Sequence, residues 1–325
     1  MKTNKAFLIQ IILLLLGFPA LLLPVIHRNI EGKFVTEPEF FPQEENHCIL
    51  VRQGEELREM DLEQYVIGVV LAEMPADFEP EALKAQAVVA RTFAWKAAVT
   101  GGKHGDASVC TNSRCCQGYL SEENYVRYYG TEDEIEKVRN AVHSTKAVVI
   151  TYGDELIEAT YFSSSGGSTE DAVAVWGNSY PYLTSKESPE PDSLGEQSTA
   201  FSRAYLETAL NIQLEGNPKR WFQDWEKTPG GGVASVKIGD RTFTGTALRE
   251  LLNLRSTVFT VTVKNDVVFF HTKGYGHRVG MSQYGAEAMA VEGKSWEEIL
   301  RYYYTGVTLE KIIQSQQNQS SLHVQ

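Results

Sequence analysis

The chain has 325 residues, enough for one large domain or two smaller ones, and its 42% apolar content is ordinary for a globular protein with a sizeable core. Its 42 acidic residues against 30 basic ones give a formal net charge of −12, which argues against nucleic acid as a partner. Four cysteines are too few for a disulfide scaffold.

Residues 7–26 near the N-terminus carry no charge. About 20 apolar residues span a bilayer as a helix, whereas the apolar region of a signal peptide is only about 7–15 residues and precedes an A-x-A-like cleavage site, which is not found here. The sequence therefore predicts a cytoplasmic N-terminus at residues 1–6, a transmembrane anchor at 7–26 and a Pro-punctuated stalk at 27–46. The flanking basic residues give only a weak bias in orientation.

A first strand is expected at residues 48–51, followed by a helical pattern that contains an unusual acid. Apolar residues recur at helical spacing over residues 62–70, and Glu73 falls on the same stripe. Pro75 biases residue 74 away from helix, so Glu73 is expected in the last turn. Burial and the negative end of the helix dipole both raise the pKa of such a carboxyl group, as a general acid requires. The pattern alone favours the simpler alternative of a Glu exposed at a frayed helix end.

A second helical pattern begins at Pro80 and ends at Gly101 and Gly102. Its Ala-rich stripe permits close helix contact, and its other faces carry polar side chains at Lys84, Gln86 and Arg91. These side chains either line a cleft or form a solvated face, and the pattern does not decide between the two.

The next segments are expected to be a loop at residues 101–118, a helix at 132–142, and a hairpin of 148–152 and 156–161. The hairpin leads into a Ser-Ser-Ser-Gly-Gly run that contains Ser164. Such a run is most often an ordinary turn, and the functional alternative is a set of hydroxyl groups and amides that bind sugar hydroxyls.

The C-terminal half is expected to alternate short helices and strands. We predict helices at 201–210 and 246–252, a strand at 234–238, a hairpin of 259–263 and 267–271, an amphipathic helix at 296–303, and a disordered polar tail at 313–325.

A glycine-rich run at residues 274–285 does not indicate a nucleotide site, because its glycine spacing is one residue too long for the dinucleotide fingerprint. The glycines are instead expected to let the backbone approach a cleft and present His277 and Gln283. A lone histidine such as His277 is nevertheless more often structural.

Several of these segments, in this order, resemble the signature of the stage II sporulation protein D family. The segments are residues 73–75, 83–87, 90–94, 162–170, 175–177, 181–183 and 274–286. The resemblance spans roughly residues 57–307. Together with the patterns above it predicts an α+β fold in which a helical hairpin carries the catalytic Glu beside β-hairpins. Two subdomains are expected around a cleft in a catalytic domain at 47–312, after one N-terminal transmembrane helix.

The resemblance implies an activity, because the family's equivalent of Glu73 is the acid/base of a lytic transglycosylase. Such an enzyme cleaves peptidoglycan between N-acetylmuramic acid and N-acetylglucosamine, here during engulfment of the forespore. Glycoside cleavage usually takes two carboxylates, but in this reaction the C6 hydroxyl of the muramic acid is the nucleophile, so one Glu suffices. Asp77 and Glu170 are candidate helpers that surface positions explain more simply. The candidates for substrate binding are Lys84, Gln86, Ser164, Thr169, His277 and Gln283.

The family's topology implies a single-pass protein of the cell membrane, with its catalytic domain on the extracytoplasmic side of the mother-cell membrane facing the forespore. The partners implied are peptidoglycan glycan strands, a sporulation cell-wall amidase and a membrane partner of the engulfment complex.

The loop at residues 104–117 resembles a zinc site of some family members, which implies His104, Cys110 and Cys116 as ligands of Zn²⁺. Imidazole and thiolate are ligands that tetrahedral zinc prefers. Cys115 stands where the family usually has His, so it adds a fourth thiolate, replaces a ligand or is idle. The alternative is a disulfide between Cys110 and Cys115 or Cys116, with Cys48 as a further candidate.

Two other functions remain open from the sequence. Relatives of the family enhance cell-wall amidases, so the domain could bind peptidoglycan and activate an amidase with little catalysis of its own. A cysteine hydrolase that combines Cys115 or Cys116 with His277 is the weaker alternative, because neither Cys has a nucleophile-elbow context.

Overall fold

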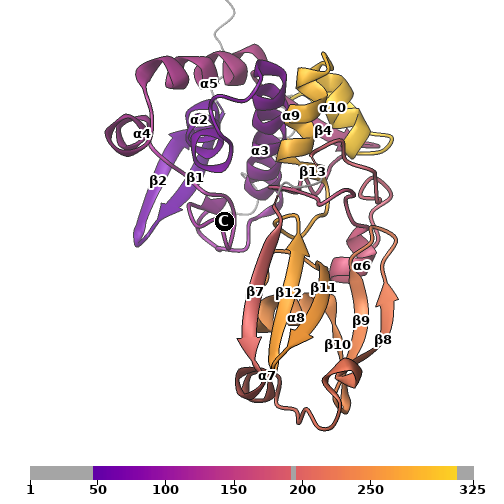
Figure 1. Ribbon diagram of the computed structural model, residues 1–325. Coiled ribbons are helices and arrows are strands. Elements are labelled where there is room, and N and C mark those ends of the chain that lie inside the picture. The colour runs from indigo at the N-terminus through magenta and orange to yellow at the C-terminus, as the bar shows by residue number, and fades with distance from the viewer. Residues whose placement is uncertain (1–46, 192–194, 313–325) are drawn as a thin grey trace, which may run out of the picture. The chain divides into compact units, whose positions relative to one another are not determined.

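The fold is built around one long helix, α3 (Pro80–Thr100), at the centre of a helical part. The computed structural model describes residues 47–191 and 195–312, all within one unit, Asn46–Gln325. Four helices pack against α3 or against each other around it (Figure 1): α2 (Leu62–Glu73), α5 (Glu132–Ser144), α9 (Gln283–Val291) and α10 (Trp296–Tyr303).

Local signals set the ends of α2 and α3 where the sequence predicted them. The Asp61 carboxylate accepts a hydrogen bond of 3.0 Å from the Gln64 amide and caps the start of α2. Met74, directly before Pro75, is extended and ends α2 at Glu73. Pro80 occupies the first turn of α3, and Gly101 ends it with a φ of 78°.

Small sheets surround the helical part. β1 (Cys48–Gln53) pairs antiparallel with β2 (Glu56–Asp61) and parallel with β3 (Val109–Cys110). β4 (Val148–Tyr152) lies where the first strand of the hairpin was predicted, but its partner β5 (Glu155–Leu156) is very short, so the second strand predicted at 156–161 is largely wrong; β4 also pairs with β14 (Thr308–Lys311). β6 (Tyr161–Phe162) pairs parallel with β13 (Met281–Ser282). Two short helices complete this part: α4 (Glu122–Tyr128) and α6 (Ala172–Trp176).

The second part is made of two three-stranded sheets and two short helices, α7 (Arg203–Leu210) and α8 (Gly245–Leu251), besides a 3-10 turn at Pro218–Arg220. One sheet has the order β11-β12-β7, with β11 (Val258–Lys264), β12 (Val267–Lys273) and β7 (Gln197–Ser202). The other has the order β10-β9-β8, with β10 (Arg241–Thr244), β9 (Val233–Ile238) and β8 (Phe222–Lys227).

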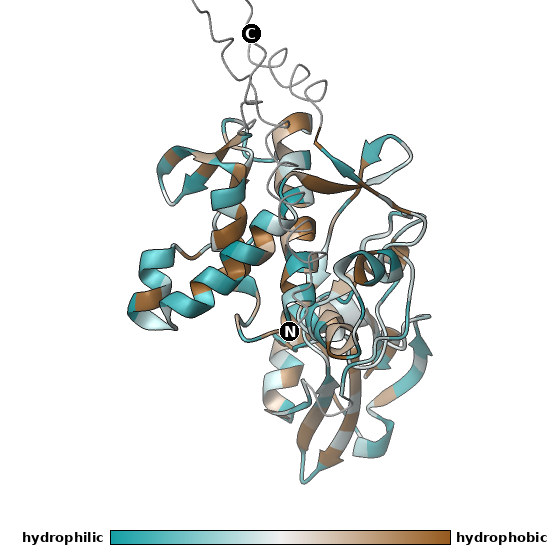
Figure 2. Ribbon diagram, turned by 90° about the horizontal axis from the view of Figure 1, so that it is seen from above, coloured by the Kyte–Doolittle hydropathy of each residue, from teal (hydrophilic) through white to brown (hydrophobic). Residues whose placement is uncertain are grey.

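Each part has its own hydrophobic core. Hydrophobic and hydrophilic residues alternate along individual helices in Figure 2, and α5 shows why: its apolar positions are buried while its acidic first turn is solvated. The helical core also contains an ion pair, in which Arg91 Nη2 lies 2.5 Å from Glu63 Oε2 and Arg91 is fully buried. Arg91 is therefore a core residue and lines no cleft.

The α+β architecture agrees with the sequence, but the predicted transmembrane helix does not find support. Within residues 47–191 and 195–312, no helix is both long and apolar enough to cross a membrane. The longest, α3, has 21 residues and carries Glu81, Lys84, Arg91 and Lys96. The prediction of a single-pass membrane anchor, and of the membrane location drawn from it, is corrected accordingly. The predicted anchor at 7–26, the stalk at 27–46 and the tail at 313–325 lie outside the described residues.

Candidate active site

Glu73 lines a cavity of about 440 Å³ to which both parts of the fold contribute. The helical part supplies Glu73 from the end of α2, Phe93 from α3, and Tyr161 from β6. The second part supplies Arg249 from α8. The loop after β12 and the start of α9 add Tyr275, Gly276, His277 and Gln283.

The Glu73 carboxyl group is half-buried and is held by hydrogen bonds without a cation. Its Oε1 accepts a hydrogen bond from the Gly118 N–H, and a Cβ atom at Gly118 would lie only 2.9 Å from that oxygen. Burial raises the pKa of Glu73, and the hydrogen bonds with Gly118 and the Tyr161 hydroxyl only partly offset this. No ion pair to Glu73 exists among the described residues. The carboxyl group is therefore biased toward its protonated form.

A buried amide orients the tyrosine beside Glu73. Gln117 Nε2 donates a hydrogen bond of 3.3 Å to the Tyr161 hydroxyl oxygen, and Gln117 Oε1 accepts one of 3.3 Å from the Tyr65 hydroxyl. Because Gln117 occupies the acceptor of Tyr161, the tyrosine's own proton is free to face Glu73.

His277 lines the cavity but is held in its neutral form. Its Nδ1 accepts a hydrogen bond of 3.1 Å from the Val279 N–H, so the ring proton resides on Nε2. Burial and then the nearby charge of Arg249 lower the pKa of His277 to about 4. Its ring lies between Phe162 and Trp176, with centroids 5.7 and 5.3 Å away. At neutral pH His277 is therefore a fixed wall of the cavity and not an acid.

Of the other substrate-binding candidates, only Gln283 lines the cavity; Gln86, Lys84, Ser164 and Thr169 do not. Gln283 lines the cavity and donates a hydrogen bond of 3.4 Å to the buried Gln86. Lys84 instead forms an ion pair of 2.6 Å with Glu81 and does not line this cavity. Ser164 and Thr169 are buried in loops. The backbone of Ser164 exchanges hydrogen bonds with the backbone of Tyr275, and Thr169 Oγ1 accepts a hydrogen bond of 2.8 Å from the Lys186 amide.

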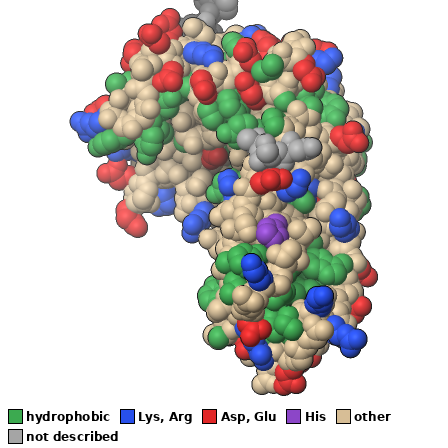
Figure 3. Space-filling model, viewed as in Figure 1, with side chains coloured by type: hydrophobic (Ala, Val, Ile, Leu, Met, Phe, Trp, Pro, Cys, Tyr) green, Lys and Arg blue, Asp and Glu red, His purple; other side chains and the backbone are tan. Residues whose placement is uncertain are grey.

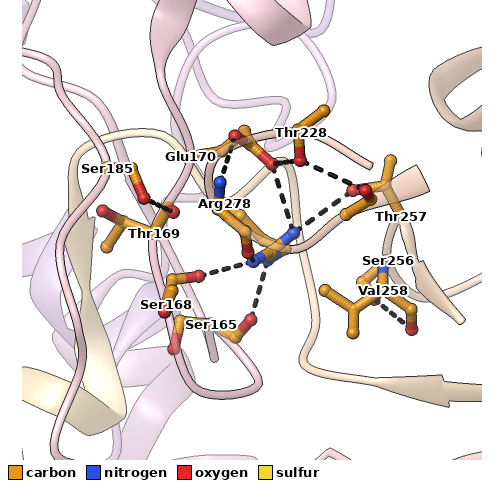
Figure 4. Close-up of polar contacts among 12 residues, drawn as sticks. Ser165, Ser168, Thr169, Glu170, Ser185, Thr228, Ser256, Thr257, Val258 and Arg278 are labelled. Carbon is orange, nitrogen blue, oxygen red and sulfur yellow. Dashed lines mark hydrogen bonds and ion pairs between the residues drawn. The ribbon is translucent and has the colours of Figure 1, made fainter. Parts of the chain in front are cut away.

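The two candidate helpers for Glu73 also lie elsewhere. Asp77 is exposed. Glu170 is buried in a network around Arg278, which donates to the Ser165 and Ser168 carbonyl groups at 2.7 and 2.6 Å and lies 3.5 Å from Glu170 (Figure 4). This network joins the Ser-Ser-Ser-Gly-Gly loop to the glycine-rich run and to Gly230. Its role is to fix these loops.

The predicted zinc ligands lie together, and Cys115 lies with them. One ligand atom from each of His104, Cys110, Cys115 and Cys116 falls within 4.8 Å of the others. His104 Nε2 is 3.2 Å from Cys116 Sγ and 3.7 Å from Cys115 Sγ. A tetrahedral zinc with ordinary bond lengths separates a nitrogen and a sulfur ligand by about 3.6 Å. The four side chains therefore fit zinc. All four cysteines of the chain are free thiols, so the alternative of a disulfide is not found, and Cys48 is exposed outside the cluster.

This cysteine cluster is physically continuous with the cavity, because Cys116 lines it and Gln117 and Gly118 follow directly. Burial raises the pKa of Cys116 to about 12, so without a metal its thiol is a poor nucleophile. Burial also acts to raise the pKa of Cys110, but hydrogen bonds from the Asn112 amide, Cys115 and Cys116 lower it overall. The contacts of Cys115 and Cys116 are with His104 and not with His277, which argues against a cysteine hydrolase.

Comparison with known proteins assigns the chain to a family. A family model described as Stage II sporulation protein matches residues 52–152. Stage II sporulation protein D of Bacillus subtilis (strain 168) is 38% identical over 264 residues, which cover 79% of this chain and 77% of that protein. The chain belongs to the stage II sporulation protein D family. The protein of the same name from Bacillus amyloliquefaciens is 39% identical and covers 77% of this chain. An "Amidase enhancer" of B. subtilis is 31% identical over 74% of this chain but 40% of its own length.

The motifs that suggested the stage II sporulation protein D family meet in space. Glu73, Phe162 and His277 come from three separate motifs and line the same cavity, and Trp176 from a fourth contacts His277. Sequence reasoning missed Tyr161, Gly118 and Arg249. Gly118 and Tyr161 are next to motif residues in the sequence, so they could have been selected as candidates. No feature of the sequence indicates that α8 contributes Arg249 to the cavity.

Proposed function

We propose that this sporulation protein is a peptidoglycan lytic transglycosylase that cleaves between N-acetylmuramic acid and N-acetylglucosamine during engulfment of the forespore. One observation carries the proposal. Glu73 presents a half-buried carboxyl group of raised pKa, without an ion pair among the described residues, to a cavity of about 440 Å³. A carboxyl group that keeps its proton near neutral pH is what a glycosidic oxygen needs from a general acid.

A single carboxyl group can complete the reaction. Protonated Glu73 gives its proton to the glycosidic oxygen as the bond from that oxygen to the anomeric carbon of the muramic acid breaks. The C6 hydroxyl of the same sugar then bonds to this carbon, and its proton passes to the Glu73 carboxylate, which restores the acid. The Gly118 N–H and the Tyr161 hydroxyl stabilise the carboxylate between the two steps. Neutral His277 and the Gln283 amide line the space that the sugar occupies.

We include zinc in the proposal, held by His104, Cys110, Cys115 and Cys116. When bound, the ion would crosslink these four side chains. The chain's own residues then transmit that order, since Gln117 and Gly118 follow the last ligand and hold Tyr161 and Glu73.

The experiment is a digestion of purified peptidoglycan strands by the purified chain, with strand lengths followed by chromatography. We expect shortening of the strands by the wild type and not by Glu73→Gln. Strands that keep their length with the wild-type chain alone would refute the proposal.

A second function is favoured by the relative named "Amidase enhancer". Here the cavity binds glycan strands, and the chain raises the activity of a cell-wall amidase without cutting the strands itself. Measuring amidase activity with added chain separates the two functions. The enhancer function is supported if the Glu73→Gln variant raises amidase activity as much as the wild type and the wild-type chain alone leaves the strands uncut. Strand cutting without amidase supports the transglycosylase.

A further inference from the structure

Arg249 brings a positive charge to the cavity that contains Glu73. It lies on α8, which packs in the hydrophobic core of the second part, and its side chain lines the cavity together with Tyr275 and His277. On the face drawn in Figure 3, Lys and Arg side chains protrude singly among acidic ones. Arg249 differs from these because it is half-buried and faces a cavity.

The guanidinium of Arg249 has unused hydrogen-bond donors. Its Nε donates to the Arg255 carbonyl oxygen at 3.3 Å, and neither amino group has a hydrogen bond or ion pair to any residue that the structure describes. The two fully buried arginines, Arg91 and Arg278, are by contrast bonded to Glu63 and Glu170 and to backbone carbonyl groups. Both amino groups of Arg249 are therefore available to a ligand that enters the cavity.

Arg249 and His277 line the same cavity as Glu73. The charge of Arg249 also helps lower the pKa of His277. The neighbouring Arg255 is already engaged, with its guanidinium 4.5 Å from the centroid of the Tyr275 ring. Among the described residues that line the cavity, Arg249 is the one with a cationic side chain.

We propose that Arg249 is a specificity-determining residue that binds a carboxylate of the sugar strand beside the bond that Glu73 cleaves. This inference rests on the proposed transglycosylase function. A guanidinium presents paired N–H donors in a plane that matches the two oxygens of a carboxylate. The carboxyl group carried directly by a peptidoglycan sugar is that of the lactyl ether of muramic acid. Arg249 therefore selects strands in which that group is a free carboxylate and positions the muramic acid against Glu73.

The test measures binding separately from cleavage, in the full chain with Glu73→Gln so that the ligand is not consumed. Calorimetry compares a tetrasaccharide of alternating N-acetylglucosamine and N-acetylmuramic acid that has free lactyl carboxylates with the same tetrasaccharide converted to primary amides. We expect the carboxylate form to bind at least about tenfold more tightly, as a charge-assisted bond in a half-buried site implies. Arg249→Gln should abolish this preference, and Arg249→Lys should retain part of it.

Arg301→Gln is the matched control, since Arg301 lies exposed on α10 and does not line the cavity. It should keep the full preference. The inference would be overturned if a folded Arg249→Gln variant still preferred the carboxylate ligand. It would also be overturned if the chain with Arg249 intact bound the carboxylate and amide ligands equally. If Arg249→Gln does not fold, an undiminished preference in Arg249→Lys would overturn it, because Lys cannot form the paired planar bonds. A carboxylate preference with no strand cleavage by the wild type would sink the transglycosylase alone and leave Arg249 as the anion-binding residue.

Discussion

Glu73 and Glu170 are acidic residues in two motifs of the same family, yet the structure places them in opposite surroundings. Glu170 is buried beside Arg278 and also accepts a hydrogen bond of 3.1 Å from the Gly230 N–H. Glu73 borders a cavity, has the Gly118 N–H and the Tyr161 hydroxyl as partners, and has no cation among the described residues. The two acids therefore differ in whether a cation lies beside the carboxyl group. Beside Arg278 the Glu170 carboxylate holds loops together, whereas Glu73, without a cation, has the raised pKa on which the proposed acid role rests.

The largest effect is expected from removing the acid that lacks a cation. Glu73→Gln should lower the rate of strand cleavage by roughly 10²–10⁴-fold, the range that general acid–base catalysis contributes, while the fold stays intact. The measurement is the initial rate of cleavage by variant and wild type, with circular dichroism as a check on folding. Asp77→Asn is the control, because Asp77 is exposed and should keep the wild-type rate. Equal rates for Glu73→Gln and wild type would show that Glu73 is not the acid.

The second prediction concerns the ion pair between Glu170 and Arg278. Arg278→Met should lower the free energy of unfolding by about 3–5 kcal/mol, because Glu170 would be left buried and unpaired. Urea unfolding measures the loss. The double variant Arg278→Met with Glu170→Met removes both charges and should recover part of it. A single variant as stable as the wild type would contradict the structural role given to this pair.

The third prediction concerns the cysteine cluster that precedes Gly118. Cys115→Ser should weaken zinc retention roughly 10- to 100-fold, comparable to the loss of a supporting group at other metal sites. The measurement is metal content by atomic emission after dialysis against a graded chelator. Cys48→Ser is the control, because Cys48 lies outside the cluster. A wild-type chain that binds no zinc would refute the site, and equal retention by Cys115→Ser would exclude Cys115 as a ligand.

The smallest effect is expected from the pH dependence that His277 confers. Its pKa is about 4 in the fold, against an ordinary value of 6.5, so between these values the unfolded chain binds the extra proton. Stability from His277 is therefore full above pH 6.5 and is lost as pH falls toward 4, by about 2 kcal/mol at pH 5. Unfolding midpoints of wild type and His277→Gln at pH 7 and pH 5 measure it. The wild type should lose more stability than the variant, and parallel losses would contradict the neutral, buried state of His277.

The sequence predicted the part of the site that local signals define. Asp61, Pro75, Pro80 and Gly101 mark the ends of α2 and α3, and these ends alone place Glu73 in a last turn at a bend. The hairpin of β11 and β12 was found for the same reason, since Asn265 and Asp266 take the positive φ angles of its turn.

The rest of the site depends on contacts between distant segments. Ser164 and Thr169 were predicted to bind sugar, but both are buried where distant segments of the chain meet: the Ser164 backbone is bonded to the Tyr275 backbone, and the Thr169 hydroxyl accepts from the Lys186 amide. Arg249 is joined to the glycine-rich run by the Arg255 carbonyl oxygen, which accepts hydrogen bonds from Arg249 Nε and from the Gly276 N–H. β8 was missed because its residues are almost all exposed at an edge of its sheet and lack the alternating pattern of a half-buried strand.

The most direct test of the central claim, that Glu73 alone carries a transglycosylase reaction, is the mass of the new strand ends formed in ¹⁸O-labelled water without any amidase. The account predicts 1,6-anhydromuramic ends free of ¹⁸O for the wild type and none for Glu73→Gln, because the sugar's own C6 hydroxyl is the nucleophile. Reducing ends that carry ¹⁸O would show hydrolysis by water and contradict the claim, as would anhydro ends produced equally by Glu73→Gln.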